Sequence, residues 1–437
     1  MKKRLIPTLS ALIVSSLLAG AVFSEDRFEG AEERIEKYRK SDLDIRVVDS
    51  EGKPVTGAKL AVRQTNSAFL FGCNIFMWGN SGNSELDEAY KRRFAELFNF
   101  ATLPYYWWSY EPQRGQPSHD HRMAVAQWCL ENGIRPKGHP LAWNFIDPSW
   151  LPDGTDEILR LQLSRIGDCV SHFKGTVDMW DVVNEMAHYD RQKLKDEQAP
   201  KTTRMIAETG PYEYTCRCFR SARKANPGAT LLINDYRMGA DYEKVIENLV
   251  DEEGKPLYDC IGLQSHMHAR PWTNDGIWNV CERFAKYGVP LHFTETTILS
   301  GKRQWDKPEG EPWPTTPDGE TYQAEEAVRF YTMVFSHPAT EALTWWDFCD
   351  RGAWKGAPAG FLRDDMSPKP VYEALRELIR RRWRTNTDVE TGPGGFARLR
   401  AFHGSYRITV ATATGEAATH DVLVVKGKDN RVEIRLP

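Results

Sequence analysis

The sequence predicts an α/β protein: a (β/α)8 TIM barrel with a short N-terminal β leader and a small C-terminal β segment. Short apolar segments alternate with helical segments between residues 67 and 384, and eight such pairs make up this kind of barrel. The length of 437 residues suits one large barrel with additions. Polar residues follow several of the apolar segments, as they do where barrel strands end at an active site.

The barrel elements are expected in strict alternation. The expected strands are residues 69–76, 100–106, 135–143, 177–184, 230–236, 260–267, 290–296 and 342–348. The expected helices are residues 84–98, 119–133, 156–174, 211–225, 241–251, 275–287, 322–337 and 370–383. Residues 67–384 are therefore predicted to form one catalytic domain.

Both ends of the chain have the pattern of short β structure. Residues 25–66 begin with a charged stretch and continue as strand, Gly/Pro turn and strand. Residues 385–437 contain alternating apolar and polar segments at 402–410, 419–425 and 431–436. We expect a leader and a small C-terminal β-sheet domain. Their shortness leaves open that they pack on each other.

The first 24 residues have the features of a secretory signal peptide. A basic start is followed by an apolar run from Leu5 to Ala21, and small residues suited to cleavage end that run. A membrane anchor is the alternative, but the run is short for a span and a hydrophilic stretch follows. The sequence predicts a secreted or periplasmic protein with no membrane association after cleavage.

Composition excludes several classes of function. Lys and Arg number 57 against 61 Asp and Glu, a formal net charge of −4, so the chain lacks a basic field for nucleic acid. The eight cysteines are dispersed, which does not suggest a disulfide framework or a structural zinc site. Cys260 and Cys281 would meet only if their strand and helix packed together. We expect a monomer without metal or cofactor.

Two predicted strands end in carboxylates. The fourth ends at Asn184 and Glu185, and the seventh ends at Thr294 and Glu295. Active sites of these barrels lie at the C-terminal ends of the strands, where a desolvated carboxylate is costly without a function. Considered singly, each glutamate could be an ordinary loop carboxylate without a catalytic role. Together, across the barrel mouth, they suggest the acid and the nucleophile of glycoside cleavage.

The motifs at the strand ends occur in an order that resembles glycoside hydrolase family 10, which consists mainly of retaining endo-1,4-β-xylanases. They are Lys137-Gly-His139-Pro-Leu-Ala-Trp143, Trp180-Asp-Val-Val-Asn184-Glu185, Asn234-Asp235-Tyr236, Ile261-Gly-Leu-Gln264-Ser-His266, Thr294-Glu295 and Trp345-Trp346-Asp-Phe-Cys-Asp350. The resemblance spans residues 69–378 and implies a TIM barrel that hydrolyses a polysaccharide.

The resemblance implies a role for each matching residue. Glu185 resembles the general acid/base and Glu295 the nucleophile, with their carboxyl groups about 5–5.5 Å apart for retention. The implied substrate contacts are His139, Trp143, Asn184, Gln264, His266, Trp346 and Trp354, and Asn234 and Asp235 are in supporting positions. The tryptophans offer apolar faces for sugar C–H groups.

Four positions depart from the family pattern. Leu103 and Tyr106 stand where the family has an Asn and a Lys, so Tyr106 is expected to make an aromatic contact with substrate. Asn144 replaces a second His, and Thr297 replaces the Asp that orients His266. Asp235 is a candidate to replace that Asp. These changes keep the groups at the cleavage point but alter the surroundings of the distal sugar.

We therefore expect an exported retaining endo-1,4-β-xylanase that cleaves internal bonds of a xylan-like polysaccharide. A related barrel glycosidase acting on β-glucan or mannan is the second hypothesis, because of the changed residues near Tyr106. A non-catalytic carbohydrate-binding protein on a decayed barrel is the third. A binding protein would have no need of both Glu185 and Glu295.

Overall fold

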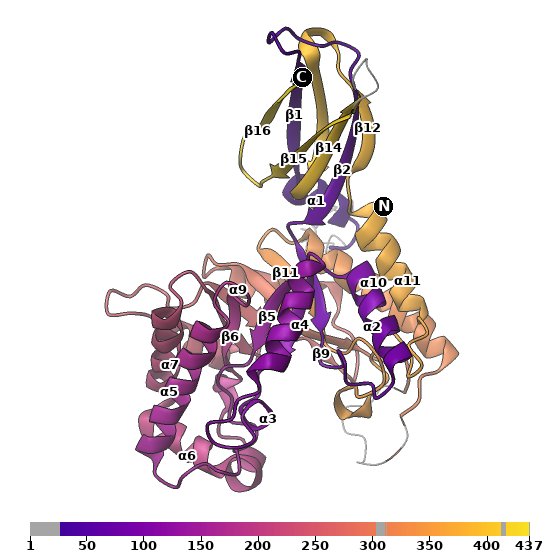
Figure 1. Ribbon diagram of the computed structural model, residues 1–437. Coiled ribbons are helices and arrows are strands. Elements are labelled where there is room, and N and C mark those ends of the chain that lie inside the picture. The colour runs from indigo at the N-terminus through magenta and orange to yellow at the C-terminus, as the bar shows by residue number, and fades with distance from the viewer. Residues whose placement is uncertain (1–26, 303–310, 312, 412–416, 437) are drawn as a thin grey trace, which may run out of the picture.

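Eight parallel strands close into a barrel, and a β-sandwich lies beside it (Figure 1). The computed structural model describes residues 27–302, 311, 313–411 and 417–436. The predicted signal peptide lies outside these residues. The barrel strands are β3 (Leu70–Asn74), β4 (Phe100–Pro104), β5 (Arg135–His139), β6 (Met179–Asn184), β7 (Thr230–Asp235), β8 (Cys260–Leu263), β10 (Leu291–Ile298) and β11 (Thr340–Trp345).

The strand order closes the barrel because β11 pairs with both β3 and β10. The short β9 (His266–Met267) pairs with the end of β10. All eight expected strands are present, so the predicted barrel is confirmed. The strand ends differ by a few residues from those expected.

The barrel helices surround the strands. They are α2 (Ser84–Leu97), α4 (His119–Glu131), α5 (Thr155–His172), α7 (Pro211–Ala225), α8 (Ala240–Asn248), α9 (Asn274–Ala285), α10 (Pro317–Ser336) and α11 (Pro370–Glu377), which η4 (Leu378–Arg382) continues. Helix α10 begins at Pro317 and not at residue 322. Thr316 caps it by accepting the Gly319 amide N–H, and proline is favoured in a first turn.

Further short elements were not expected from the sequence. They are α3 (Trp107–Tyr110), η1 (Met186–His188), η2 (Leu194–Gln198), α6 (Pro200–Thr209) and η3 (Trp354–Gly356). Three of them, η1, η2 and α6, fill the segment that follows β6. The segment after β6 therefore consists largely of short helices at the mouth of the barrel.

The two ends of the chain share one β-sandwich (Figure 1). One sheet has the order β13 (Phe396–Phe402), β1 (Lys40–Val48), β16 (Asn430–Arg435). The other has the order β12 (Asn386–Glu390), β2 (Lys59–Ser67), β14 (Gly404–Ala411), β15 (Ala417–Val424), and η5 (Pro393–Gly395) connects the sheets. Each sheet combines one strand from the N-terminal end, β1 or β2, with strands from the C-terminal end. Neither end therefore builds this sandwich alone.

The sandwich has its own buried core, which both ends supply. Its buried members include Leu43, Ile45, Val47, Leu60, Val62, Tyr406, Ile408, Val410, Val424 and Ile434. Each terminal segment has too few apolar residues to cover both faces of a sheet. Packing the segments on each other removes those faces from water.

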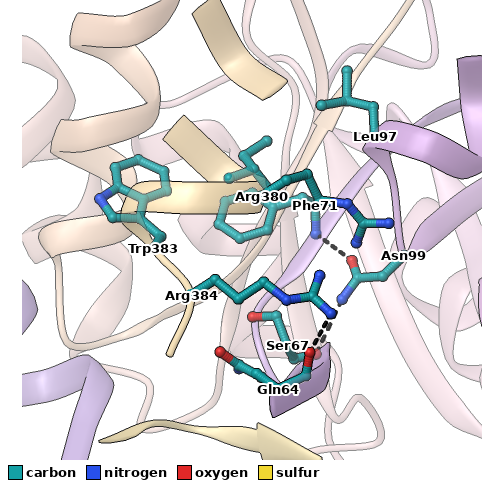
Figure 2. A pocket seen from close by; sticks show the side chains of 9 residues that line it. Gln64, Ser67, Phe71, Leu97, Asn99, Arg380, Trp383 and Arg384 are labelled. Carbon is teal, nitrogen blue, oxygen red and sulfur yellow. Dashed lines mark hydrogen bonds between the residues drawn. The ribbon is translucent and has the colours of Figure 1, made fainter. Parts of the chain in front are cut away.

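The sandwich joins the barrel where the barrel strands begin. The Asn66 side chain donates to the Gly133 carbonyl, just before β5, at 2.9 Å. Asn99, just before β4, accepts from the Phe71 amide at 2.8 Å and donates to the Ser67 carbonyl at 3.0 Å (Figure 2). The sandwich is therefore on the side of the barrel opposite to the strand ends that carry the polar motifs.

The cysteines are all buried and free. Cys260 lies inside the barrel with Phe100 and Met179, whereas Cys281 on α9 packs in the core between helices and strands. The pairing considered for Cys260 and Cys281 is therefore not formed, because the two side chains lie on opposite faces of the barrel sheet.

The leader helix α1 (Ala31–Arg39) is fastened to the barrel by Arg39. This buried guanidinium donates to the carbonyls of Phe335 at 2.5 Å and His337 at 2.6 Å, and to the Thr340 hydroxyl at 2.8 Å. Burial lowers the pKa of Arg39 to about 10, so the group is still charged at neutral pH.

We expect Arg39→Met to lower the free energy of unfolding by about 3 kcal/mol, because buried acceptors lose a charged donor. Urea unfolding followed by circular dichroism measures this loss. Lys37→Met, which removes an exposed charge from the same helix, is the control. Equal unfolding midpoints for the two variants would contradict a structural role for Arg39.

Candidate active site

Glu185 directly follows β6 in an unusual backbone conformation. Its φ of 59° and ψ of 38° lie in the left-handed region, which is uncommon for residues other than glycine. Its amide N–H donates to the Asn234 carbonyl at 2.8 Å, which fastens this conformation to the end of β7. Strained positions of this kind cluster at functional sites. Glu185 is nearly buried, with 9% of its surface exposed.

A bulge in β6 positions the residues before Glu185. The register with β7 shifts between Asp181 and Val183. In a regular strand, residues three apart such as Asp181 and Asn184 point to opposite faces. The extra residue of the bulge brings both side chains to the same face. Both side chains are buried and bond to groups on neighbouring strands within the barrel.

Asp181 holds two groups of β5. One oxygen, Oδ2, accepts from Lys137 Nζ at 2.6 Å and from His139 Nδ1 at 2.7 Å. Burial favours the neutral acid, but the charges and hydrogen bonds of Lys137 and His139 lower the pKa of Asp181 overall. His139 is thereby fixed with Nε2 directed at Glu295, at 3.9 Å from Oε1.

Glu295 lies on β10 among three nitrogen groups. Oε1 accepts from Asn234 Nδ2 at 2.8 Å, and Oε2 is 3.0 Å from His266 Nε2. Burial favours the neutral acid, but His139 and the hydrogen-bonded His266 lower the pKa of Glu295 overall. Glu295 is only 4% exposed. Because little water competes for its oxygens, these hydrogen bonds are stronger than they would be at the surface.

Asn234 and Gln264 connect the two glutamates. Asn234 Nδ2 donates to Glu295 and also to Asn184 Oδ1, at 2.8 Å each. Gln264 Nε2 donates to Asn184 Oδ1 and to Glu185 Oε1, at 3.2 Å each. A continuous chain of hydrogen bonds therefore runs from one carboxylate to the other.

Asn234 is itself fixed on both sides. The Thr294 hydroxyl donates to Asn234 Oδ1 at 2.7 Å. Gly262 on β8 leaves the space for this amide, since a Cβ at Gly262 would come within 2.4 Å of Oδ1. Steric space therefore explains why the Ile261-Gly-Leu motif has a glycine at this position.

Arg191 holds the other oxygen of Glu185. Its Nη2 lies 2.6 Å from Glu185 Oε2, and its guanidinium stacks over the ring of Tyr236 at 5.4 Å from the centroid. Burial opposes the charge, but Glu185 and Tyr236 raise the pKa of Arg191 overall. Arg191 could not be singled out from the sequence, because it lies in a segment after β6 that no motif covers.

An aromatic cluster lies on the β4 and β5 side of the site. Tyr106 stacks with Trp108 at 4.9 Å, and Trp143 stacks with Phe145 at 4.2 Å between ring centroids. Tyr106 also lies 5.9 Å from Trp143 and meets His139 edge-on at 5.6 Å. Burial and the nearby carboxylates, Glu295 foremost, raise the pKa of Tyr106 well above its usual value.

Two tryptophans lie against the histidines. Trp346 meets His139 and His266 edge-on at 5.3 and 5.8 Å between centroids. Trp354 in η3 lies 4.6 Å from His266. The predicted site residues therefore converge at the C-terminal ends of the strands.

The departures from the family pattern have visible consequences. Thr297 Oγ1 lies 2.9 Å from His266 Nδ1, so a hydroxyl takes the place of the missing carboxylate. Asp235 does not take that place: it accepts from the amides of Ala187 at 2.9 Å and Arg237 at 2.8 Å. Burial raises the pKa of Asp235 to about 7.

Other charged groups near the site were also missed as functional residues. Lys137 and Asp181 were part of quoted motifs, but the bulge that turns Asp181 inward has no sequence signal. Asp347, next to Trp346, is 6% exposed and accepts from the Trp354 amide at 3.1 Å. Burial raises its pKa to about 7. The described part of the chain contains no cluster of His, Cys, Asp and Glu arranged to hold a metal ion.

Comparisons with known proteins agree with this geometry. Residues 62–378 match the model of Glycosyl hydrolase family 10. Endo-1,4-beta-xylanase B of Thermotoga neapolitana is 27% identical over 353 residues, which are 77% of this chain and 95% of that protein. Anti-sigma-I factor RsgI6 of Acetivibrio thermocellus is 29% identical over 388 residues, 87% of this chain. The chain spans less than half of RsgI6, namely 46% of its length.

A solved structure shows the same fold. Xylanase 10B from Thermotoga petrophila RKU-1, crystallised in complex with xylobiose, superposes with a TM-score of 0.58 at 27% identity. The match covers 72% of this chain and 95% of that one. The resemblance found in the sequence is confirmed, and the chain belongs to glycosyl hydrolase family 10.

Proposed function

We propose that this protein is an exported endo-1,4-β-xylanase that retains the anomeric configuration. The observation that carries the proposal is the pair Glu185 and Glu295, two buried carboxylates joined by the amides of Asn184, Asn234 and Gln264. Their surroundings differ, because histidines contact Glu295 and an arginine contacts Glu185. Different surroundings suit two carboxylates with different tasks.

In the first step Glu295 acts as the nucleophile. One of its oxygens attacks the anomeric carbon, while Glu185 donates a proton to the glycosidic oxygen and the bond to the leaving sugar breaks. His139, His266 and Asn234 favour the ionised form of Glu295 that this attack needs. The product is a glycosyl ester of Glu295.

In the second step Glu185 acts as the base. It accepts a proton from a water molecule, whose oxygen attacks the anomeric carbon and releases Glu295 as a carboxylate. Two inversions give net retention. Asn184 supports both steps, because donors from Asn234 and Gln264 hold its Oδ1 and orient its NH2 group toward the sugar 2-hydroxyl.

The remaining predicted contacts define a carbohydrate cleft. We assign His139, Gln264 and His266 to the sugar at the cleavage point, and Trp143, Trp346, Trp354 and Tyr106 to its aromatic walls. The proposal of xylan as the substrate rests on relatives named endo-1,4-beta-xylanases. Tyr106, which stands where the family has a Lys, stacks with Trp108, and this aromatic pair favours a related specificity such as β-glucan or mannan as the second candidate.

The division of the chain follows from the same proposal. Residues 67–384 are the catalytic domain, and residues 25–66 and 385–437 are the accessory segments that combine in the sandwich. Residues 1–24 direct export, and the enzyme acts as a monomer. Among the described residues no helix is long and apolar enough to span a membrane.

We expect Glu295→Ala to abolish hydrolysis of every substrate, since no ester can form. Glu185→Ala should lose at least about 100-fold in kcat/KM on xylan but keep kcat/KM on aryl xylosides with good leaving groups, which need no proton in the first step. Reducing-sugar release from a panel of xylan, β-glucan and mannan, together with aryl xyloside kinetics, measures both. Equal losses for Glu185→Ala on both kinds of substrate would contradict this assignment.

We expect Thr297→Asp to move the acidic limb of the kcat/KM profile to lower pH by about one unit. Activity requires ionised Glu295 and is lost as pH falls through its pKa. A carboxylate beside Nδ1 favours the charged form of His266, and charged His266 favours ionised Glu295. Thr297→Asn, equal in size but neutral, is the control. Coinciding limbs for Thr297→Asp and Thr297→Asn would show that charge at this position is not transmitted.

A further inference from the structure

Arg191 contacts the side chain of Glu185 although it lies outside the sequence motifs. Its guanidinium lies 2.6 Å from Glu185 Oε2, while Gln264 Nε2 lies 3.2 Å from Oε1. The two oxygens of the carboxylate thus have different partners, one charged and one neutral. The side chains are 22% and 11% exposed, so water screens the ion pair only in part.

The segment that carries Arg191 is held at several points. Two residues after Glu185, the Ala187 amide donates to Asp235 at 2.9 Å. Two residues before Arg191, the Tyr189 carbonyl accepts from Asn144 Nδ2 at 2.7 Å. Asn144 also donates to Thr203 on α6 at 2.8 Å and is 1% exposed. The asparagine that replaces a family histidine thus anchors this segment.

Tyr236 supports the guanidinium from its other side. The ring lies under Arg191, and the Tyr236 hydroxyl lies 2.6 Å from His188 Nδ1. The long side chain is therefore confined between an aromatic face and the Glu185 carboxylate. Because the Arg191 side chain is already confined, it loses less conformational entropy when the ion pair forms.

We propose that Arg191 is a positioning residue that stabilises the ionised form of Glu185 and thereby sets the alkaline limit of activity. The inference rests on the proposed acid/base role of Glu185. An adjacent guanidinium favours a carboxylate over its neutral acid. It therefore assists the step in which Glu185 accepts a proton and opposes the step in which Glu185 donates one.

Several other titratable groups face Glu185. Asp235 and Tyr236 lie at the end of β7, and Tyr106 follows β4. The Asp235 carboxylate repels that of Glu185, so it acts against Arg191. His139 and His266 contact Glu295 and leave Arg191 as the cation bonded directly to Glu185 among the residues that the structure describes.

The test is the pH dependence of kcat/KM for Arg191→Met. On xylan, whose leaving group needs a proton, the alkaline limb should move to higher pH by about one unit or more. At a pH well above the parental limb the variant should be about tenfold faster than the parent for a shift of one unit. An aryl xyloside with a good leaving group needs no proton from Glu185 in the first step. With this substrate the alkaline limb should not move between the parent and Arg191→Met.

Matched variants separate this role from a structural one. Arg191→Lys keeps the charge and should keep the alkaline limb near the parental position. Lys193→Met removes an exposed positive charge from the same segment and should leave the profile unchanged. An alkaline limb for Arg191→Met at the parental pH, with aryl xyloside turnover intact, would overturn the proposal. So would an equal shift in Lys193→Met, which would point to net charge alone.

The outcome is distinguishable from a failure of the proposed function. If the parent hydrolyses no β-1,4-linked polysaccharide, or Glu185→Ala loses activity equally on xylan and aryl xylosides, the acid/base assignment itself fails. If those results are as expected and only the Arg191→Met limb stays in place, the inference about Arg191 alone fails.

Discussion

The double hydrogen bond of the Asn234 amide is the contact on which the rest of the site depends. It joins Glu295 on β10 to Asn184 at the end of β6, and Asn234 itself stands on β7. A buried carboxylate without partners is costly. The site avoids this cost by sharing donors among several strands, so that Glu295 is held both by Asn234 on β7 and by His266 on β9.

The barrel provides this arrangement because its interior changes character along the strands. Phe100, Met179, Leu232, Cys260 and Ala342 form an apolar group inside the barrel. The buried pair of Lys137 on β5 and Asp181 on β6 lies nearer the C-terminal ends of the strands, before His139 and Asn184. The sandwich packs at the opposite side, where it adds stability to the strand beginnings without covering the polar ends.

Much of the fold could be predicted because the pattern is local. Eight strands and eight helices follow from apolar periodicity, Glu185 directly follows β6, and Glu295 lies in the C-terminal half of β10. What could not be predicted depends on contacts distant in sequence. The bulge at Asp181, the common sandwich of both chain ends and the reach of Arg191 back to Glu185 are set by neighbouring strands and loops.

The same reasoning explains why single departures from the family pattern do not act alone. Asn144 fixes the segment before Arg191, and Arg191 in turn contacts Glu185. Thr297 offers His266 a hydroxyl, while His139, held by Asp181, is a second histidine directed at Glu295. The two carboxylates have different surroundings, two imidazoles at Glu295 and one guanidinium at Glu185, which suits the different tasks proposed for them.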